Sequence, residues 1–486
     1  MAIHTEPVWG DDRLEVMGSV EAAVTRLIEL YRESTALAAD VIERAAYPEY
    51  ARVTYPKLVV DVREWRPIDR SEPFGYVNES GRCSAVLSKP HLMRSYLTDQ
   101  LTRLTENYPC DLLVGPSEIR IPPEYIRGIE NISEVRRAGD QADAVPRPTL
   151  DEVHDAIIDG EWDAFHGPEK PLFHFGPQRF DIACARIEHY TGIEVDTLQD
   201  FVLFTNYAMH TREFVRFGLR ELDREDSRYT TLILPDGRKI TREHAGQLID
   251  AQLEAERSTS SAFQMPRYDL TTRDGGGITM INIGVGPSNA KTITDCIAVL
   301  RPEAWIMIGH CAGLDGRMRI GDLILGNAYQ RQDRLLDGYI TPNNPIPAVP
   351  EIQRALEYSV DAIYGGDRSM MRTGTVLSTG DRNWEWRTPR ELWEWLRGST
   401  AAVDMESCAL AANGYRYRIP YGTLLSVSDL PLHAVPKLPA QAQAFYSSSK
   451  EAHVMCAVRA METLAQNPER LRTRKLRRAM GEVPFR

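Results

Sequence analysis

Short apolar runs alternate with helical stretches in the second half of the chain, and this alternation restricts the possible folds more than any other feature. Phe201–Phe204, Thr230–Leu234 and Ile278–Ile283 have the apolar, β-branched composition of strands. A helical pattern at Ser288–Leu300 separates the third run from a fourth, Ala304–Ile308. Strands that alternate with helices form a parallel or mixed sheet with helices on both faces. The sequence therefore predicts an α/β domain in this half.

The first half of the chain has a different pattern. Residues 14–45 carry apolar side chains at helical spacing with Glu and Arg between them, and a second helix is expected around His91–Thr105. Runs such as Lys57–Val62, broken by Pro and Gly, are typical of strands and turns. At 486 residues the chain is also too long for one ordinary core. We expect an N-terminal α+β domain over residues 1–195 and an α/β domain with a basic C-terminal tail over residues 196–486.

Charge and cysteine usage exclude several classes of protein. The net charge of −12 provides no overall basic field to hold nucleic acid or an anionic membrane. No stretch approaches the roughly 18 apolar residues of a membrane span, and the acidic first 20 residues do not resemble a signal peptide. The seven cysteines form no CxxC pair and have no histidine at zinc-finger spacing. We expect a cytoplasmic protein with reduced thiols and without a bound metal.

A glycine-rich turn, Gly284–Ala290, follows a predicted strand and opens a predicted helix. Glycines allow the backbone to approach a ligand, and the free N–H groups at a helix start favour anions or hydroxyl oxygens. Gly286 and Ser288 are therefore candidate ligand contacts, although such turns are common in α/β proteins and Ser288 could simply be an N-cap. The turn lacks the spacing of a dinucleotide-binding fingerprint or a P-loop, so neither NAD nor a Walker-type ATPase is indicated.

A second candidate segment, Ile308–Leu314, lies at the carboxyl end of a predicted strand, where open α/β sheets bind ligands. Gly309 leaves room there for a flat base, but a tight turn would require a glycine equally well. His310, taken alone, is more often a structural histidine than a functional one.

Two acids complete the candidate site. Glu406 stands at the start of a predicted helix that Asn413 and Gly414 would end, and Asp429 follows the predicted strand Tyr421–Val427. A carboxylate beside a cleft can hold two vicinal hydroxyls, and a second carboxyl whose pKa is raised by burial can act as a general acid. Either acid taken alone is more often a surface residue or a helix cap.

The order and spacing of four segments resemble the purine nucleoside phosphorylase and nucleosidase superfamily over roughly residues 200–460. These segments are Gly284–Ala290, Ile308–Leu314, Val403–Ser407 and Ser426–Asp429. Over nearly its full length the chain is also similar to the bacterial AMP nucleosidase family. The stretches that carry this second similarity include Arg94–Leu97, His189–Gly192, Phe201–Tyr207, Trp305–Gly309 and Pro420–Leu425. The resemblance implies a phosphorylase-like mixed sheet flanked by helices, an N-terminal α+β regulatory domain, and hydrolysis of AMP to adenine and ribose 5-phosphate in purine salvage.

The resemblance also implies roles for individual residues. Asp429 matches the acid that protonates the purine, Glu406 matches the residue that holds the 2′ and 3′ hydroxyls, and Met405 would pack on the sugar. Trp384 falls in a base-facing loop, where it could stack on adenine or belong to the core. Arg382, beside it, could hold the 5′-phosphate or be an ordinary surface arginine.

The nucleophile and the regulation are inferred in the same way. Met307 occupies the position where phosphorylases commonly place an arginine for phosphate, which favours water over the alternative, phosphorolysis of purine nucleosides. Lys437 could close on Asp429, reach phosphate or be solvated. The paired acids argue against a protein that only senses AMP. The resemblance further implies MgATP as an allosteric activator, inhibition by phosphate and a homohexamer, with no cofactor in catalysis, although residues 1–195 contain no recognisable nucleotide motif.

Overall fold

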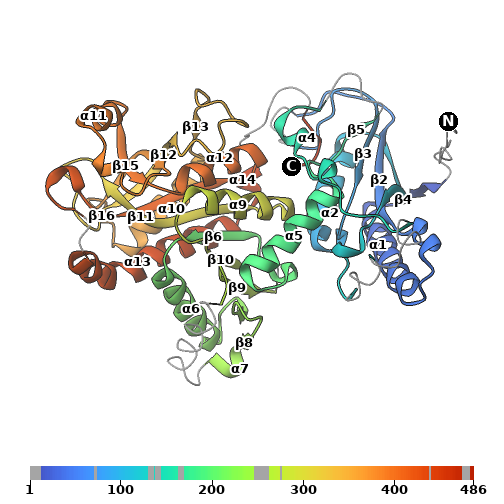
Figure 1. Ribbon diagram of the computed structural model, residues 1–486, viewed down its shortest axis with the longest axis horizontal. Helices are drawn as coiled ribbons and strands as arrows, with labels where there is room; N and C mark the ends of the chain where they lie inside the picture. Colours follow the sequence, from blue (N-terminus) through green and yellow to red (C-terminus); the bar gives the residue numbers. More distant parts are fainter. Residues whose placement is uncertain are drawn as a thin grey trace. The chain divides into compact units, whose positions relative to one another are not determined.

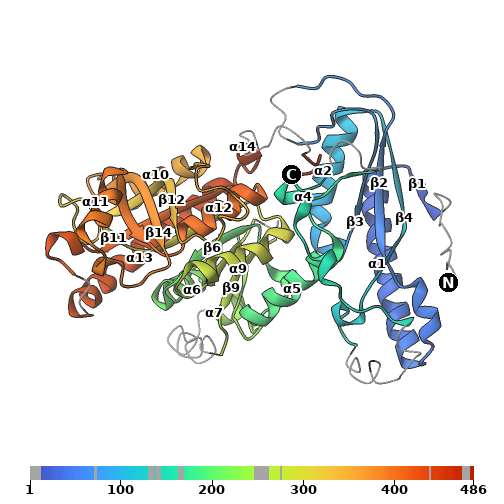
Figure 2. The same cartoon turned by 45° about the horizontal axis from the view of Figure 1, so that its top comes forward.

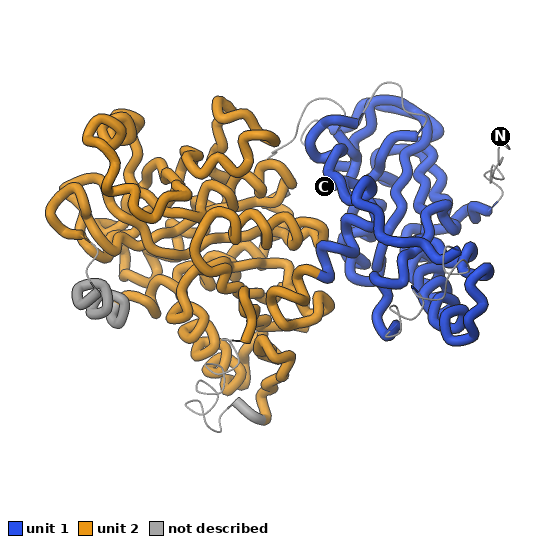
Figure 3. Tube along the Cα trace, in the orientation of Figure 1, with its two compact units in different colours: residues 1–185, 477–486 blue, residues 186–476 orange. Residues whose placement is uncertain are grey.

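The computed structural model describes residues 13–69, 74–129, 136, 144–162, 169–245, 262–273, 276–436, 439–472 and 482–486. The chain forms two compact units (Figure 3). Unit 1 comprises Met1–Ala185 with Arg477–Arg486, and unit 2 comprises Arg186–Leu476. The division falls inside helix α5 (Pro177–Thr191), whereas the sequence placed it near residue 195. The C-terminal residues belong to unit 1, although the sequence grouped them with the second half. No helix in the described ranges is long and apolar enough to cross a membrane.

Unit 1 is built on a five-stranded sheet in the order β1-β4-β2-β3-β5 (Figures 1 and 2). Its strands are β1 (Glu15–Met17), β2 (Thr54–Val62), β3 (Gly81–Val86), β4 (Cys110–Arg120) and β5 (Lys170–Pro171). Neighbouring strands are antiparallel except for β3 and β5. Its helices are α1 (Val20–Glu43), α2 (Arg94–Asn107), α4 (Ala156–Asp159) and the first part of α5. The long helix α1 packs against β2 and β4, which confirms the expected α+β organisation.

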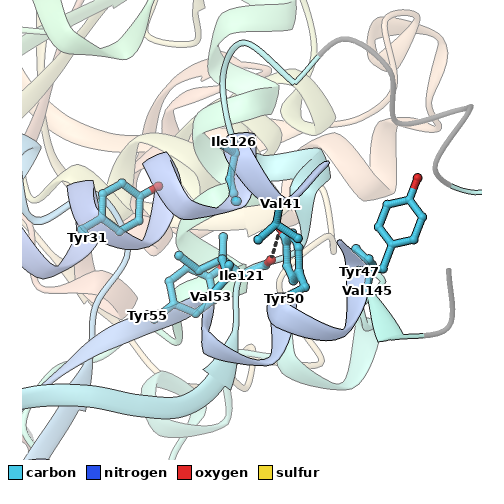
Figure 4. Packing of buried hydrophobic residues seen from close by; sticks show 10 residues of the cluster. Tyr31, Val41, Tyr47, Tyr50, Val53, Tyr55, Ile121, Ile126 and Val145 are labelled. Carbon is cyan, nitrogen blue, oxygen red and sulfur yellow. Dashed lines mark hydrogen bonds between the residues drawn. The ribbon is translucent and has the colours of Figure 1, made fainter. Parts of the chain in front are cut away.

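Local sequence explains where α1 begins and what it buries. The hydroxyl of Ser19 accepts a hydrogen bond from the N–H of Ala22 at 3.1 Å, an N-cap that typically stabilises a helix by about 1 kcal/mol. The apolar face of α1 contributes Tyr31 and Val41 to a buried cluster (Figure 4). Within this cluster the hydroxyl of Tyr50 donates to the carbonyl of Ile121 at 3.0 Å, so a buried polar group keeps a partner.

Unit 2 contains an 11-stranded mixed sheet. Ten strands follow the order β13-β12-β14-β15-β11-β6-β10-β9-β7-β8, and β16 pairs with β11 and β12. The strands are β6 (Phe201–Thr205), β7 (Tyr229–Ile233), β8 (Lys239–Thr241), β9 (Arg267–Thr272), β10 (Ile278–Asn282), β11 (Ala304–Gly313), β12 (Leu323–Gln332), β13 (Ile346–Pro347), β14 (Met371–Thr379), β15 (Thr400–Asp404) and β16 (Tyr421–Asp429).

Helices cover this sheet (Figures 1 and 2). They are α6 (Ala208–Asp223), α7 (Arg242–Ala245), α9 (Pro287–Ile297), α10 (Pro350–Ile363), α11 (Pro389–Arg397), α12 (Ser407–Tyr417), α13 (Pro439–Ala465) and α14 (Glu469–Arg472). The central strands β11 and β16 are buried along their whole length, as expected for strands covered on both faces. The mixed sheet with flanking helices confirms the predicted phosphorylase-like α/β fold.

The register of β11 and β16 positions the residues of the site. The two strands run parallel, pairing His310 with Ser426 and Cys311 with Val427. An irregularity after Cys311 then places Ala312 opposite Asp429. Because parallel strands end at the same edge of a sheet, the carboxyl ends of β11 and β16 lie at a common edge. A β-bulge, such as the register shift after Cys311, is often found next to a functional site.

Candidate active site

A cavity of about 340 Å³ lies in unit 2 at the carboxyl ends of several strands. This volume falls within the range of small-molecule sites, roughly 300–1,000 Å³. Residues at the ends of β6, β11, β15 and β16 form its wall, together with the loop after β14. The lining residues are Asn206, Tyr207, Val285, His310, Cys311, Ala312, Arg382, Trp384, Glu385, Val403, Asp404, Met405, Glu406, Ser428 and Asp429.

The structure brings five of the predicted site residues together around this cavity: Asp429, Glu406, Met405, Trp384 and Arg382. Trp384 lines the cavity and is also buried in a small apolar cluster, with its ring centroid 5.6 Å from that of Trp395. Arg382 also lines the cavity, and its side chain is exposed to solvent.

Glu406 is a buried carboxyl held by neutral donors. The backbone N–H of Gly286 donates to its Oε1 at 2.7 Å, and the side-chain amide of Asn206 donates to its Oε2 at 3.1 Å. Burial, followed by the negative charge of Asp404, raises the pKa of Glu406 to about 8. The group therefore carries a proton in most molecules near neutral pH when the cavity holds no ligand.

Asp404 lies two residues before Glu406, at the end of β15. It accepts hydrogen bonds from the hydroxyl of Ser378 and, at 2.9 Å, from the backbone N–H of Ser407 in the first turn of α12. Burial raises the pKa of Asp404 as well, while these hydrogen bonds favour its charged form. Two buried carboxyls that repel each other in one wall are a recurrent feature of catalytic sites.

Asp429 ends β16 and is 3% exposed. The hydroxyl of the preceding Ser428 donates to its Oδ1, which orients the carboxyl. Both residues line the cavity. The strand therefore delivers one acid to the same space that Glu406 faces from the start of α12.

Two predicted contacts support the wall without lining the cavity. Gly286 adopts a φ of +120°, which favours glycine, and its N–H binds the carboxylate of Glu406. Gly309 is buried beside Asn206, where a Cβ atom would lie 3.2 Å from the amide Oδ1. The need for glycine at both positions is therefore steric and conformational.

Several expectations require correction. Ser288 is exposed in the first turn of α9, and Gly286 is the N-cap of that helix, so Ser288 neither caps it nor lines the cavity. The helix after Glu406 does not end at Asn413. Helix α12 continues through Asn413 to Tyr417. The side-chain amide of Asn413 donates to Thr294 Oγ1 of α9 at 2.8 Å. Lys437 lies outside the described residues.

Sequence reasoning gave no role to several polar or aromatic residues of the wall, among them Asn206, Tyr207 and Asp404. Asn206 and Tyr207 directly follow β6, and polar residues immediately after a buried strand are a usable signal in α/β proteins. Asp404 also ends a strand, but its importance depends on the proximity of its charge to Glu406, which only the fold reveals.

Comparisons with known proteins identify matching families for both halves of the chain. A family described as the N-terminus of bacterial AMP nucleoside phosphorylase matches residues 22–169, and the phosphorylase superfamily matches residues 234–462. The chain is 42% identical over 441 residues to the AMP nucleosidase of Escherichia coli strain K12, covering 89% of each protein. It is 24% identical over 162 residues to a 5′-methylthioadenosine/S-adenosylhomocysteine nucleosidase of Marinomonas sp., covering 32% of this chain and 70% of that protein.

Solved structures show lower similarity. An AMP nucleosidase from Bacteroides thetaiotaomicron superimposes with a TM-score of 0.42 at 24% identity, covering 60% of this chain and 99% of that one. A purine nucleoside phosphorylase from Toxoplasma gondii, in complex with immucillin-H, gives a TM-score of 0.41 at 14% identity, covering 57% of this chain and 97% of that one.

Proposed function

This chain belongs to the AMP nucleosidase family, and from that premise we propose how its cavity hydrolyses the N-glycosidic bond of AMP to adenine and ribose 5-phosphate. The observation that carries the proposal is the meeting of two buried acids, Asp429 and Glu406, with an aromatic ring, Trp384, in the wall of one cavity. The acids supply what the two halves of the substrate need, and the ring supplies a flat apolar surface for a base.

Asp429 is the proposed general acid. Adenine leaves poorly as an anion, so a proton must reach its ring, most plausibly at N7, as the glycosidic bond breaks. A positioned general acid contributes roughly 10²- to 10⁴-fold to such a step. The buried position of Asp429 at the end of a rigid strand, with Ser428 orienting one oxygen, suits a group that must meet a single ring nitrogen.

Glu406 is the proposed ribose ligand. Asn206 and Gly286 hold its two oxygens, which leaves lone pairs for the 2′ and 3′ hydroxyls of the sugar. These hydroxyls are donors, so their binding favours the ionised carboxylate and lowers the raised pKa of the empty site. The resulting negative charge stabilises the positive charge that the ribose develops in an oxocarbenium-like transition state.

Met405, Trp384 and Arg382 complete the proposed contacts. The two apolar side chains would pack on the sugar and the base. Arg382, at the exposed side of the wall, would meet the 5′-phosphate, for which a planar guanidinium is well suited.

Water is the proposed nucleophile. Met307, at the position where an arginine would serve a phosphorylase, is fully buried in β11 and does not line the cavity. Chromatography of the products from AMP, with and without phosphate, tests the proposal. Ribose 5-phosphate should form at the same rate in both reactions or more slowly with phosphate. A ribose bisphosphate that appears only with phosphate would show phosphorolysis instead.

We further propose, from family membership, that MgATP activates the enzyme allosterically, that phosphate inhibits it, and that it works in the cytoplasm as a homohexamer. The family match to residues 22–169 places most of unit 1 in the N-terminal region that is characteristic of this family. Allostery requires an effector to bind one state of the enzyme better than another. Initial rates with and without MgATP test the proposed activation. The mass of the particle by light scattering tests the proposed homohexamer.

A further inference from the structure

Three buried histidines from three separate elements of unit 2 lie together next to the cavity. His210 comes from α6, His310 from β11 and His453 from α13. One ring nitrogen of each lies within 4.8 Å of the corresponding nitrogens of the other two. The ring centroid of His210 is 5.3 Å from that of His310 and 5.1 Å from that of His453. All three are at most 6% exposed.

The hydrogen bonds of His453 define which nitrogen is available. Its Nε2 lies 2.8 Å from the carbonyl oxygen of Leu424, and because a carbonyl only accepts, Nε2 carries the proton. Its Nδ1 is therefore an unprotonated lone-pair donor in the neutral ring. This atom is buried and has no hydrogen-bond partner within the described ranges.

In His210 the other ring nitrogen is anchored, by a hydroxyl that can either donate or accept. Its Nδ1 lies 2.8 Å from the hydroxyl oxygen of Thr205, and its buried Nε2 has no partner in the described part of the chain. Buried polar atoms without partners are uncommon in proteins and call for a physical explanation. A metal-binding histidine usually has one ring nitrogen hydrogen-bonded to a protein oxygen, which leaves the other nitrogen for the metal.

We propose that His210, His310 and His453 form a binding site for a divalent transition metal, with Zn²⁺ the preferred ion. Three imidazoles and no carboxylate suit zinc, copper, iron or nickel rather than magnesium or calcium. A tetrahedral zinc with bonds of about 2.0–2.1 Å places its nitrogens roughly 3.4 Å apart. The ring nitrogens lie within 4.8 Å of one another, so they would approach by up to about 1.4 Å. The three residues are too widely separated along the chain to form a spacing motif.

Metal content measured on the full-length protein tests this proposal independently of catalysis. Protein stripped with a chelator, equilibrated with Zn²⁺ and passed through gel filtration should retain about one zinc per chain by elemental analysis. Equilibration with Co²⁺ should produce the intense visible absorption of a tetrahedral nitrogen site. Retention of no metal together with no such absorption in the wild-type protein would overturn the proposal and leave a buried water as the partner of the two nitrogens.

Variants localise the site. His453→Gln and His210→Gln should each weaken zinc binding at least 10-fold, and His189→Gln, at an exposed histidine of α5, should bind zinc like the wild type. Zinc should also raise the melting temperature of the wild type and of His189→Gln but not of the other two variants. Equal zinc retention in all four proteins would place the metal elsewhere. These readouts do not depend on turnover of AMP, so the metal site and the proposed function can fail separately.

Discussion

Two buried carboxyls, one in each unit, differ in their partners: one forms a structural ion pair, and the other is a candidate functional acid. Asp181 in unit 1 has a fully buried side chain and accepts hydrogen bonds from Tyr55 and Ser88, each at 2.6 Å, and from the ammonium of Lys89. Glu406 in unit 2 is equally buried but is held by an amide and a backbone N–H, with a second acid beside it. The first charge is neutralised by a cation within the fold, whereas no cation in the described part of the chain pairs with the second.

The cation in unit 1 confirms this contrast. Burial lowers the pKa of Lys89, but the charge and hydrogen bond of Asp181, together with electrostatic interactions with Tyr31 and Cys184, outweigh this effect and raise the pKa above its usual value. Lys89 therefore stays charged, and its ion pair with Asp181 is structural. A buried acid without a cationic partner, in the wall of a cavity, is instead a candidate for chemistry. Burial alone does not distinguish a functional acid, whereas the charge of its partners does.

The largest loss of turnover is expected when Asp429, the acid at the end of β16, is replaced. Asp429→Asn preserves shape and burial but removes the transferable proton, so kcat for AMP should fall roughly 10²- to 10⁴-fold, or about 3–5 kcal/mol of barrier. Adenine release by chromatography measures the rate, and the melting temperature should stay close to that of the wild type. Near-normal turnover would end the assignment of Asp429 as the acid.

The structural acid should behave in the opposite way. Asp181→Ala leaves Lys89 buried without its partner, and breaking a buried pair in this way typically costs about 3–5 kcal/mol. Denaturant unfolding should show this loss, while kcat per folded molecule stays within a few-fold of the wild type. If stability were unchanged and turnover collapsed, the contrast between the two acids would be wrong.

An intermediate effect is expected at the ribose ligand. Glu406→Gln keeps a hydrogen-bonding side chain but loses the charge, and charged hydrogen bonds contribute about 1.5–3 kcal/mol, so kcat/KM should fall roughly 10- to 150-fold. Steady-state kinetics with AMP and with its 2′-deoxy analogue measure this. The wild type should discriminate strongly between the two substrates and the variant weakly. If the variant discriminated between the two substrates as strongly as the wild type, Glu406 would not be the ligand of the ribose hydroxyls.

A further prediction concerns the dependence of stability on pH. Because the pKa of Glu406 in the folded protein is about 8 and its ordinary value is 4.5, protonation of this group stabilises the fold. That stabilisation is complete below pH 4.5 and is lost as the pH rises through 8. Denaturant titrations across this range should show a decline that is smaller in Glu406→Gln than in the wild type. Identical pH dependence in both proteins would contradict the raised pKa.

Local sequence patterns predicted the elements and the strand-end positions of the site. Alternating apolar runs located β6, β10 and β11, and the end of a buried run located Asp429. They could not show that Asn206 and Gly286 hold Glu406, because these contacts join residues 200 and 120 positions apart. The histidine cluster was hidden for the same reason.

The end of the chain teaches the same lesson. The sequence grouped the last residues with the second half of the chain, yet Val483, Phe485 and Arg486 are buried and belong to unit 1. Phe485 packs edge-on against Tyr96, with ring centroids 6.2 Å apart, and the N–H of Gly75 donates to the carbonyl of Pro484 at 2.7 Å. The partners of this short apolar segment are specified only by the fold.

The dependence of Asp429 on the leaving group tests the central claim most directly. AMP requires a proton on the departing base, whereas p-nitrophenyl riboside 5-phosphate releases a stable phenolate without one. Asp429→Asn should therefore lose roughly 10²- to 10⁴-fold of its turnover with AMP and only a few-fold with the p-nitrophenyl substrate. Equal losses with both substrates would show that Asp429 does something other than deliver a proton to the purine.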